Sequence, residues 1–256
     1  MKFHVLSAND RFSSLINMSN MSRNTRPYNS KLSVPWDIQD CIRALVVVAI
    51  VAATAVTILW FISRDDSPIK PSVITIALIT PHFAMVIATW IYGIRKYSTG
   101  WNSIGFSRPI QRWAMLLPWP VIIASIATSG IYFAIVSSTG MDFLIPRRIP
   151  PEIIGNGSHL ILNIFLISLA GPMIEELFFR GFVLSSLVQP LGFFKAIIIS
   201  SFIFSASHLA IGVLIPFFIT GMMLAWLYLK TRSLWPPFIA HSMQNLLALM
   251  AALYAN

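Results

Sequence analysis

The stretch CIRALVVVAIVAATAVTILWFI, residues 41–62, decides the fold class of this chain. Its single charged side chain is Arg43, close to its start. An α-helix rises about 1.5 Å per residue, so about 20 apolar residues cross the hydrocarbon core of a bilayer. Inside lipid the backbone must satisfy its own hydrogen bonds, which a helix does within one segment. The stretch therefore predicts a transmembrane helix.

Further apolar runs follow along the chain. They predict spans near residues 73–94, 114–137, 158–180, 194–209, 211–230 and 234–254. The connector GFVLSSLVQPLGF, residues 181–193, is expected to form a short helix at the membrane edge, or an eighth span if it enters the bilayer. The chain is 56% hydrophobic and 11% charged, whereas soluble domains carry about 25% charged residues. The predicted fold is all-α, a polytopic transmembrane helix bundle of about seven to eight spans.

The N-terminal segment differs in composition from the rest. Residues 1–36 are rich in Ser, Asn and Arg and lack the apolar core of a signal peptide, so we expect a disordered N-terminal tail. Residues 37–256 form the expected transmembrane domain. Met18 and Met21 are alternative positions at which translation could start.

The net charge of +9 does not indicate nucleic-acid binding. Basic residues lie at the ends of apolar runs, as in SRDDSPIK, IRKY, PRRIP and LKTRS, which is typical of loops beside lipid headgroups. The tail and the second loop are more basic than the first and third loops, so the positive-inside rule predicts a cytoplasmic N-terminus. Cys41 is the only cysteine, which excludes a disulfide framework and a thiolate metal cluster.

Acidic residues are rare from residue 158 onward, where Glu175 and Glu176 stand side by side in GPMIEELFFRG, residues 171–181. An ionisable group inside a span costs roughly 2.5–3.5 kcal/mol on insertion scales, which makes it a functional-site hypothesis. Glu176 and Arg180 are four residues apart and share one helix face, while Glu175 points about 100° away. Arg180 can thus neutralise the carboxylate of Glu176, while the carboxylate of Glu175 points to another part of the structure. The alternative is that all three charges mark the cytoplasmic end of a helix, although acids there oppose the helix dipole.

Two later helices repeat the four-residue spacing. Phe204 and His208 lie in FIFSASHLA, and His241 and Asn245 lie in PPFIAHSMQNLLALM. Each pair alone could be a polar clamp between helices. Together with a glutamate, however, two imidazoles and an amide can activate water and stabilise an oxyanion. His82, in TPHFAMV of the second span, lies outside this pattern and is expected to be structural or gating.

The segments EELFFR, FSASH and HSMQN resemble, in order, the three motifs of the CAAX protease and bacteriocin-processing intramembrane protease family. That family includes Ras-converting CAAX endopeptidases, bacteriocin-processing or self-immunity proteins, and abortive-infection-like proteins. The motifs cover about residues 175–245, within an expected protease core of about 158–254. The resemblance implies an intramembrane endopeptidase, hence a hydrolase, with a polar cavity reached from the cytoplasmic side.

The resemblance also implies residue roles. Glu175 would activate the attacking water together with His208, and His241 and Asn245 would stabilise the oxyanion or complete the site. The supporting residues would be Glu176, Arg180 and Phe204.

Relatives are often called metalloproteases, and an N/O ligand set suits Zn²⁺. The candidate ligands would be Glu175, His208 and His241, but the same groups also suit a metal-free water activated by glutamate. The expected substrate is a membrane-associated protein or peptide, with prenylated and bacteriocin-like substrates as options. The expected location is a bacterial-type inner membrane, within the lipid bilayer and with no nucleic-acid partner.

Two other functions fit the polar groups. A membrane binding or immunity protein could keep the pocket without proteolysis. A proton-coupled transporter also uses buried Glu and His, but it would predict internal repeats, and residues 41–138 do not resemble 158–254. The sequence contains no His-Glu-x-x-His zinc helix, no Gly-x-Ser-Gly nucleophile of the rhomboid kind and no paired Asp within the spans.

Overall fold

Helices account for nearly all of the regular structure in the computed structural model, which describes residues 33–64, 69–109, 111–146 and 151–254. No strand occurs in these ranges. The long α-helices are α2 (Ile38–Ile62), α3 (Pro71–Thr89), α4 (Pro118–Thr139), α9 (Phe193–Ala206), α10 (Leu214–Thr231) and α11 (Trp235–Tyr254). Short elements connect them: η1 (Trp90–Arg95), η2 (Trp101–Ile104), η3 (Arg112–Leu116), η4 (Asp142–Leu144), α5 (Pro151–Ile154) and η7 (Ile211–Val213).

One further helix is continuous over five elements and is called here the motif rod, residues Gly157–Leu191. Its elements are α6 (Gly157–Phe165), η5 (Leu166–Ala170), α7 (Gly171–Glu175), η6 (Glu176–Leu184) and α8 (Ser185–Leu191). The segments η5 and η6 are π-helical. π-Helical turns inside α-helices are frequent at functional sites.

The multi-pass, all-α prediction is confirmed. Five helical segments of the described chain are long and apolar enough to cross a bilayer: Ile38–Ile62, Pro71–Arg95, Arg112–Thr139, Gly157–Leu191 and Ile211–Thr231. The shorter apolar α9 and the 20-residue α11 bring the number of long helical segments in the described part to seven, as the sequence predicts.

The prediction that the fourth span ends near residue 180 was wrong, as was that of a separate helix at the membrane edge after it. The motif rod has 35 residues and is therefore about 52 Å long at 1.5 Å per residue. Glu175 lies about 27 Å from its start and about 24 Å from its end on the same count. The glutamate is thus near the middle of a long helix and not at its terminus.

The described structure begins four residues before the predicted domain boundary at residue 37. Residues 1–32 of the expected tail lie outside the described part, whereas Val34 and Trp36 are buried. The Trp36 indole Nε1 donates a hydrogen bond of 3.0 Å to the carbonyl oxygen of Phe182, and the two rings stack at 5.6 Å. The segment before α2 is therefore fixed against the motif rod.

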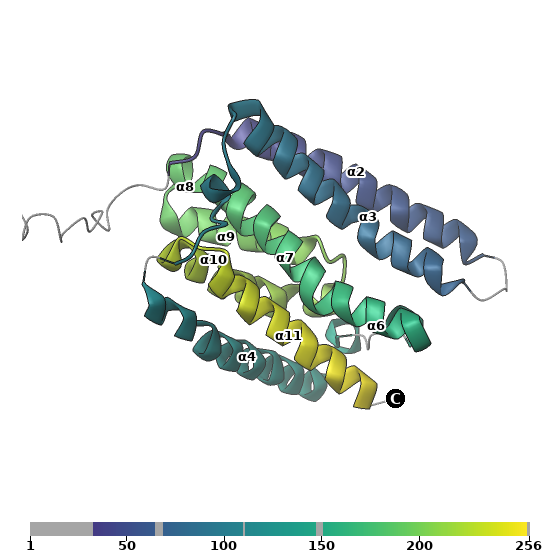
Figure 1. Ribbon diagram of the computed structural model, residues 1–256. Coiled ribbons are helices and arrows are strands. Elements are labelled where there is room, and N and C mark those ends of the chain that lie inside the picture. Colours follow the sequence, from purple (N-terminus) through teal and green to yellow (C-terminus); the bar gives the residue numbers. More distant parts are fainter. Residues whose placement is uncertain (1–32, 65–68, 110, 147–150, 255–256) are drawn as a thin grey trace, which may run out of the picture. The chain divides into compact units, whose positions relative to one another are not determined.

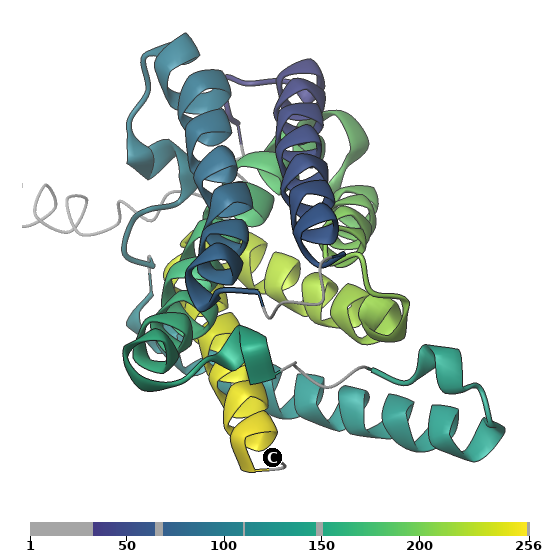
Figure 2. The same cartoon turned by 90° about the vertical axis from the view of Figure 1, so that its right-hand side faces the viewer.

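A buried carboxylate joins the start of α2 to the segment after α3. Asp37 caps α2 by accepting the backbone N–H of Asp40 at 3.0 Å. The Asp40 side chain is fully buried and accepts hydrogen bonds from Lys96 Nζ and Tyr97 Oη, both at 2.6 Å. The hydrogen bond to Asp40 raises the pKa of Lys96 above its usual value. These contacts explain why α2 and α3 run side by side (Figures 1 and 2).

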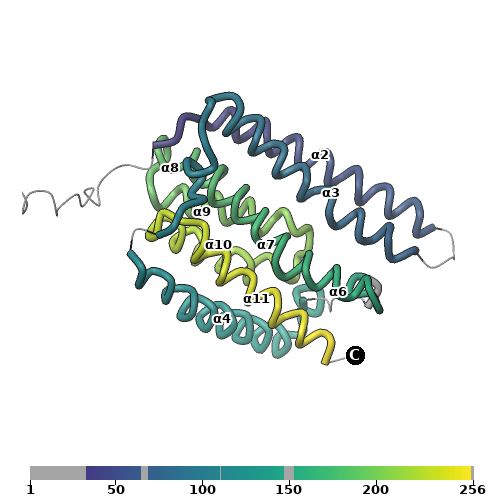
Figure 3. The backbone as a smooth tube through the Cα atoms, in the orientation of Figure 1, coloured from purple at the N-terminus to yellow at the C-terminus, as the bar shows by residue number. Residues whose placement is uncertain are grey.

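The motif rod lies among the helices that carry the other polar residues (Figure 3). It contacts α2, α3, α9, α10 and α11. On the other side of α10 and α11, α4 packs against both, with Val121, Leu224 and Ala240 in a buried apolar cluster. The rod can therefore bring its side chains to residues from five other long helices.

Candidate functional site

Glu176 and Arg180 form a buried ion pair on one face of the motif rod. Arg180 Nη1 donates to Glu176 Oε1 at 2.8 Å, and the exposed fractions of the side chains are 2% and 0%. The Arg180 guanidinium also lies 4.1 Å from the centre of the Phe204 ring. The spacing of four residues therefore produces the pairing that the sequence predicts, and Phe204 supports it from α9.

His241 is held by the same carboxylate. Its Nδ1 is 2.8 Å from Glu176 Oε1, so the ring donates this hydrogen bond and carries a proton on Nδ1. The other ring nitrogen, Nε2, lies 3.8 Å from Glu175 Oε2. Glu176 therefore fixes the tautomer and the direction of His241.

His208 is oriented by the backbone of the helix that precedes it. It lies two residues after the end of α9, and its Nδ1 donates to the carbonyl oxygen of Phe204 at 2.9 Å. The edges of the Phe204 and Phe217 rings lie against it, with centroid distances of 5.0 and 4.6 Å. His208 Nε2 is 3.9 Å from Glu175 Oε2.

Glu175 is the point at which these residues meet. Its side chain is 14% exposed. Its Oε2 atom is buried and has no hydrogen-bond partner among the described residues. The Nε2 atoms of His208 and His241 are too distant from Oε2 for direct hydrogen bonds but close enough for a water molecule to bridge each of them to Oε2. Two ring nitrogens that carry lone pairs thus lie near the same carboxylate oxygen.

Glu175 also contacts a third histidine, His82, which the sequence analysis placed outside the site. His82 Nε2 of α3 lies 3.3 Å from Glu175 Oε1. No spacing pattern could identify it, because 93 positions separate the two residues. The only sequence signal was a histidine within an apolar span, which is itself a functional-site hypothesis.

Asn245 lies one turn after His241 on α11. Its Nδ2 donates a hydrogen bond of 2.9 Å to the carbonyl oxygen of Ile167 in η5. This bond joins α11 to the motif rod and uses one of the two amide hydrogens. The second hydrogen is left for another acceptor.

The prediction of Zn²⁺ with Glu175, His208 and His241 as candidate ligands stays a prediction. No group of three His, Cys, Asp or Glu side chains in the described part of the chain is arranged to hold a metal ion. The reaction proposed below is accordingly written with the side chains of this chain alone.

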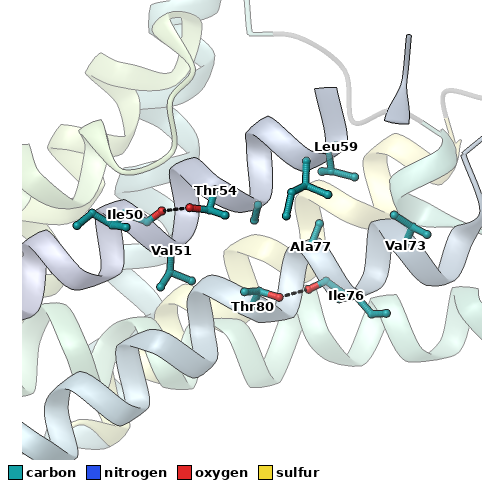
Figure 4. Close-up of a pocket in the computed structure, with 10 residues that line it drawn as sticks. Ile50, Val51, Thr54, Leu59, Val73, Ile76, Ala77 and Thr80 are labelled. Atoms are coloured by element: carbon teal, nitrogen blue, oxygen red, sulfur yellow. Dashed lines mark hydrogen bonds between the residues drawn. The ribbon is translucent and has the colours of Figure 1, made fainter. Parts of the chain in front are cut away.

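A separate groove of about 250 Å³ lies between α2 and α3 (Figure 4). Its lining is apolar except for Thr54 and Thr80. Both hydroxyls donate to carbonyl oxygens of their own helices, those of Ile50 and Ile76. The groove has no side chain suited to hydrolysis and is distinct from the Glu175 site.

Comparison with known proteins finds one family model and two curated relatives, and the family model matches the motif-bearing part of the chain. Residues 157–247 match a family described as Type II CAAX prenyl endopeptidase Rce1-like. The candidate membrane peptidase YdiL of Bacillus subtilis is 37% identical over 84 residues, which are 33% of this chain and 34% of YdiL. The membrane-embedded CAAX protease MroQ of Staphylococcus aureus is 26% identical over 159 residues, which are 59% of this chain and 57% of MroQ. No solved structure matches the chain.

The resemblance to CAAX proteases is therefore confirmed for this part of the chain. The matched regions span only about a third and just over half of the two curated relatives.

Proposed function

We propose that this chain is an intramembrane endopeptidase that hydrolyses a peptide bond in a membrane-associated protein or peptide. The observation that carries the proposal is the buried, partnerless Oε2 atom of Glu175, with imidazole nitrogens at 3.8 and 3.9 Å. The names of the relatives, a candidate membrane peptidase and a CAAX protease, support the same reaction class.

In the proposed reaction, one water molecule lies between Glu175, His208 and His241. With Nδ1 protonated, each neutral ring presents a lone pair at Nε2. The water has two hydrogens, so it donates one to Glu175 Oε2 and the other to one of these two lone pairs. Glu175 Oε2 takes a proton as the water oxygen attacks the substrate carbonyl carbon. The carboxyl then gives this proton to the amine that leaves when the C–N bond breaks.

Asn245 is the proposed donor to the oxyanion. Its second amide hydrogen is not used by the bond to Ile167 and can meet the carbonyl oxygen as negative charge develops there. Removing one such donor costs about 10²–10³-fold in kcat in a well-studied hydrolase. Glu176 and Arg180 act indirectly, because they hold His241 and the helix.

The test uses quenched-fluorescence peptides of varied sequence, each anchored in liposomes by one farnesyl or palmitoyl chain. Wild-type chain reconstituted in the same liposomes should cut a subset, and Glu175→Gln should cut none. Mass spectrometry of the products then identifies the bond. Equal cleavage by wild type and Glu175→Gln would overturn the proposed mechanism, and no cleavage by wild type would favour a binding function.

We also propose that the start of α2 is cytoplasmic and that the site is reached from that side. Support comes from the basic residues Arg43, Arg95 and Lys96 at one end of α2 and α3. The exposed positions Asn102 and Asp142 lie in loops that should face opposite sides of the membrane. Single cysteines there, in a Cys41→Ser background, should react with a membrane-impermeant maleimide from opposite sides.

A further inference from the structure

His82 contacts the proposed catalytic carboxylate on the edge opposite the two motif histidines. Its Nε2 meets Glu175 Oε1 at 3.3 Å, whereas His208 and His241 face Oε2. A contact that holds one oxygen of a carboxylate limits the rotation of the whole carboxylate group. The direction of the reactive oxygen therefore depends on a residue from α3, outside the three motifs.

The His82 ring is itself fixed from its own helix. Its Nδ1 donates to the carbonyl oxygen of Leu78 at 2.7 Å, one turn earlier. Since the partners of both ring nitrogens are acceptors, the His82 ring carries a proton on each nitrogen and is an imidazolium, unlike the rings of the two motif histidines. Space for the ring comes from Gly171 of the motif rod. A Cβ atom at that position would lie 2.8 Å from the carbonyl oxygen of Leu166 in the rod itself and 3.2 Å from His82 Nε2. The absence of a side chain at Gly171 thus lets the imidazole of α3 approach the rod closely.

A packing role alone does not explain these contacts. The His82 side chain is 26% exposed, similar to His208 at 27% and unlike the enclosed His241 at 6%. A residue that only filled space would not need a nitrogen at each end, one directed to its own backbone and one to Glu175.

We propose that His82 is a positioning residue that holds Glu175 Oε1 so that Oε2 faces the attacking water. This inference rests on the proposed peptidase function and adds a residue from α3 to it. A misplacement of about 1 Å can cost roughly 10²-fold in rate. Loss of the contact should therefore lower kcat by about 100-fold and leave KM almost unchanged.

Two variants of His82 test the hydrogen bonds of its two ring nitrogens one at a time. In His82→Gln the amide nitrogen occupies the place of Nε2 and can still donate to Glu175. In His82→Asn the amide nitrogen occupies the place of Nδ1, so it keeps the bond to Leu78 and loses Glu175. We expect His82→Gln to retain most of the wild-type kcat and His82→Asn to show the decrease of about 100-fold, with similar melting temperatures for both.

A second measurement does not depend on cleavage. Dicyclohexylcarbodiimide modifies carboxyl groups in membranes, and a carboxylate held by a donor should react slowly. Mass spectrometry should show faster modification of Glu175 in His82→Asn than in the wild type or in His82→Gln.

The outcomes distinguish the inference from the proposed function. Equal kcat and equal labelling of Glu175 in wild type and His82→Asn would overturn the positioning role while cleavage stands. A parallel loss of activity and melting temperature in both variants would show that His82 is only structural. If wild type cuts no anchored peptide, the proposed function fails, and the labelling rates still decide whether His82 holds Glu175.

Discussion

Replacing Glu176 with alanine should cost both stability and activity, for separate reasons. Its Oε1 atom accepts two buried hydrogen bonds of 2.8 Å, from Arg180 and His241. Without it, the guanidinium of Arg180 remains buried with no carboxylate beside it. Breaking a buried ion pair from one side costs about 3–5 kcal/mol. For a chain of this size, each kcal/mol changes the melting temperature by about 2–4 °C, so a decrease on the order of 10 °C is expected.

A double variant separates the two effects. Glu176→Met combined with Arg180→Met removes both charges and leaves apolar side chains of similar length, which often restores stability. His241 still lacks the acceptor that fixes its ring. The double variant should therefore melt near the wild-type temperature and remain inactive on the anchored peptides.

The assay is thermal unfolding in one detergent, followed by cleavage in liposomes. Asp142→Ala is the matched control, because Asp142 is an exposed carboxylate in a short loop helix. It should melt and cleave like the wild type. The reasoning is refuted if Glu176→Ala melts like Asp142→Ala, or if the double variant cleaves at the wild-type rate.

Three further predictions concern single contacts and the metal. Gly181→Ala should destabilise the chain by about 1–3 kcal/mol in thermal unfolding, because a Cβ there overlaps the Ile104 side chain. Ser125→Ala should cost only about 0.6 kcal/mol and leave cleavage unchanged, because it removes one hydrogen bond, of 2.7 Å, to Thr220. Purified protein should contain much less than stoichiometric zinc by mass spectrometry, and phenanthroline should not slow cleavage, because no described group of three ligands is spaced for a metal.

The pairing within the motif could be predicted from the sequence because it depends on helix geometry alone. Spacing of four residues gives Glu176 and Arg180 a common face, and adjacency turns Glu175 away from it. The spacing of Phe204 and His208 likewise gives a contact within one turn, here from His208 Nδ1 to the Phe204 carbonyl. These relations need no knowledge of the tertiary structure.

The length of the motif rod could not be predicted in this way. Ser185 and Ser186 lie in the connector that the sequence predicts as a separate short helix, yet both side chains are buried within the motif rod. Their hydroxyls donate to the carbonyl oxygens of Arg180 and Val183 in the same rod. Because serine can satisfy its hydroxyl within a helix, the helix continues and Glu175 comes to lie near its middle. Serine content alone does not distinguish these two outcomes.

The two adjacent glutamates illustrate how one helix can create two different chemical environments. Glu176 is fully buried and its Oε1 is neutralised by Arg180, so it serves to orient His241. Glu175 faces three histidines from three other segments of the chain, and one of its oxygens has no described partner. A single glutamate could not both hold His241 by Nδ1 and receive a proton from water beside Nε2 of the same ring. The hydrolytic site we propose therefore requires the pair, and exchanging the roles of the two residues would require the helix to rotate by about 100°.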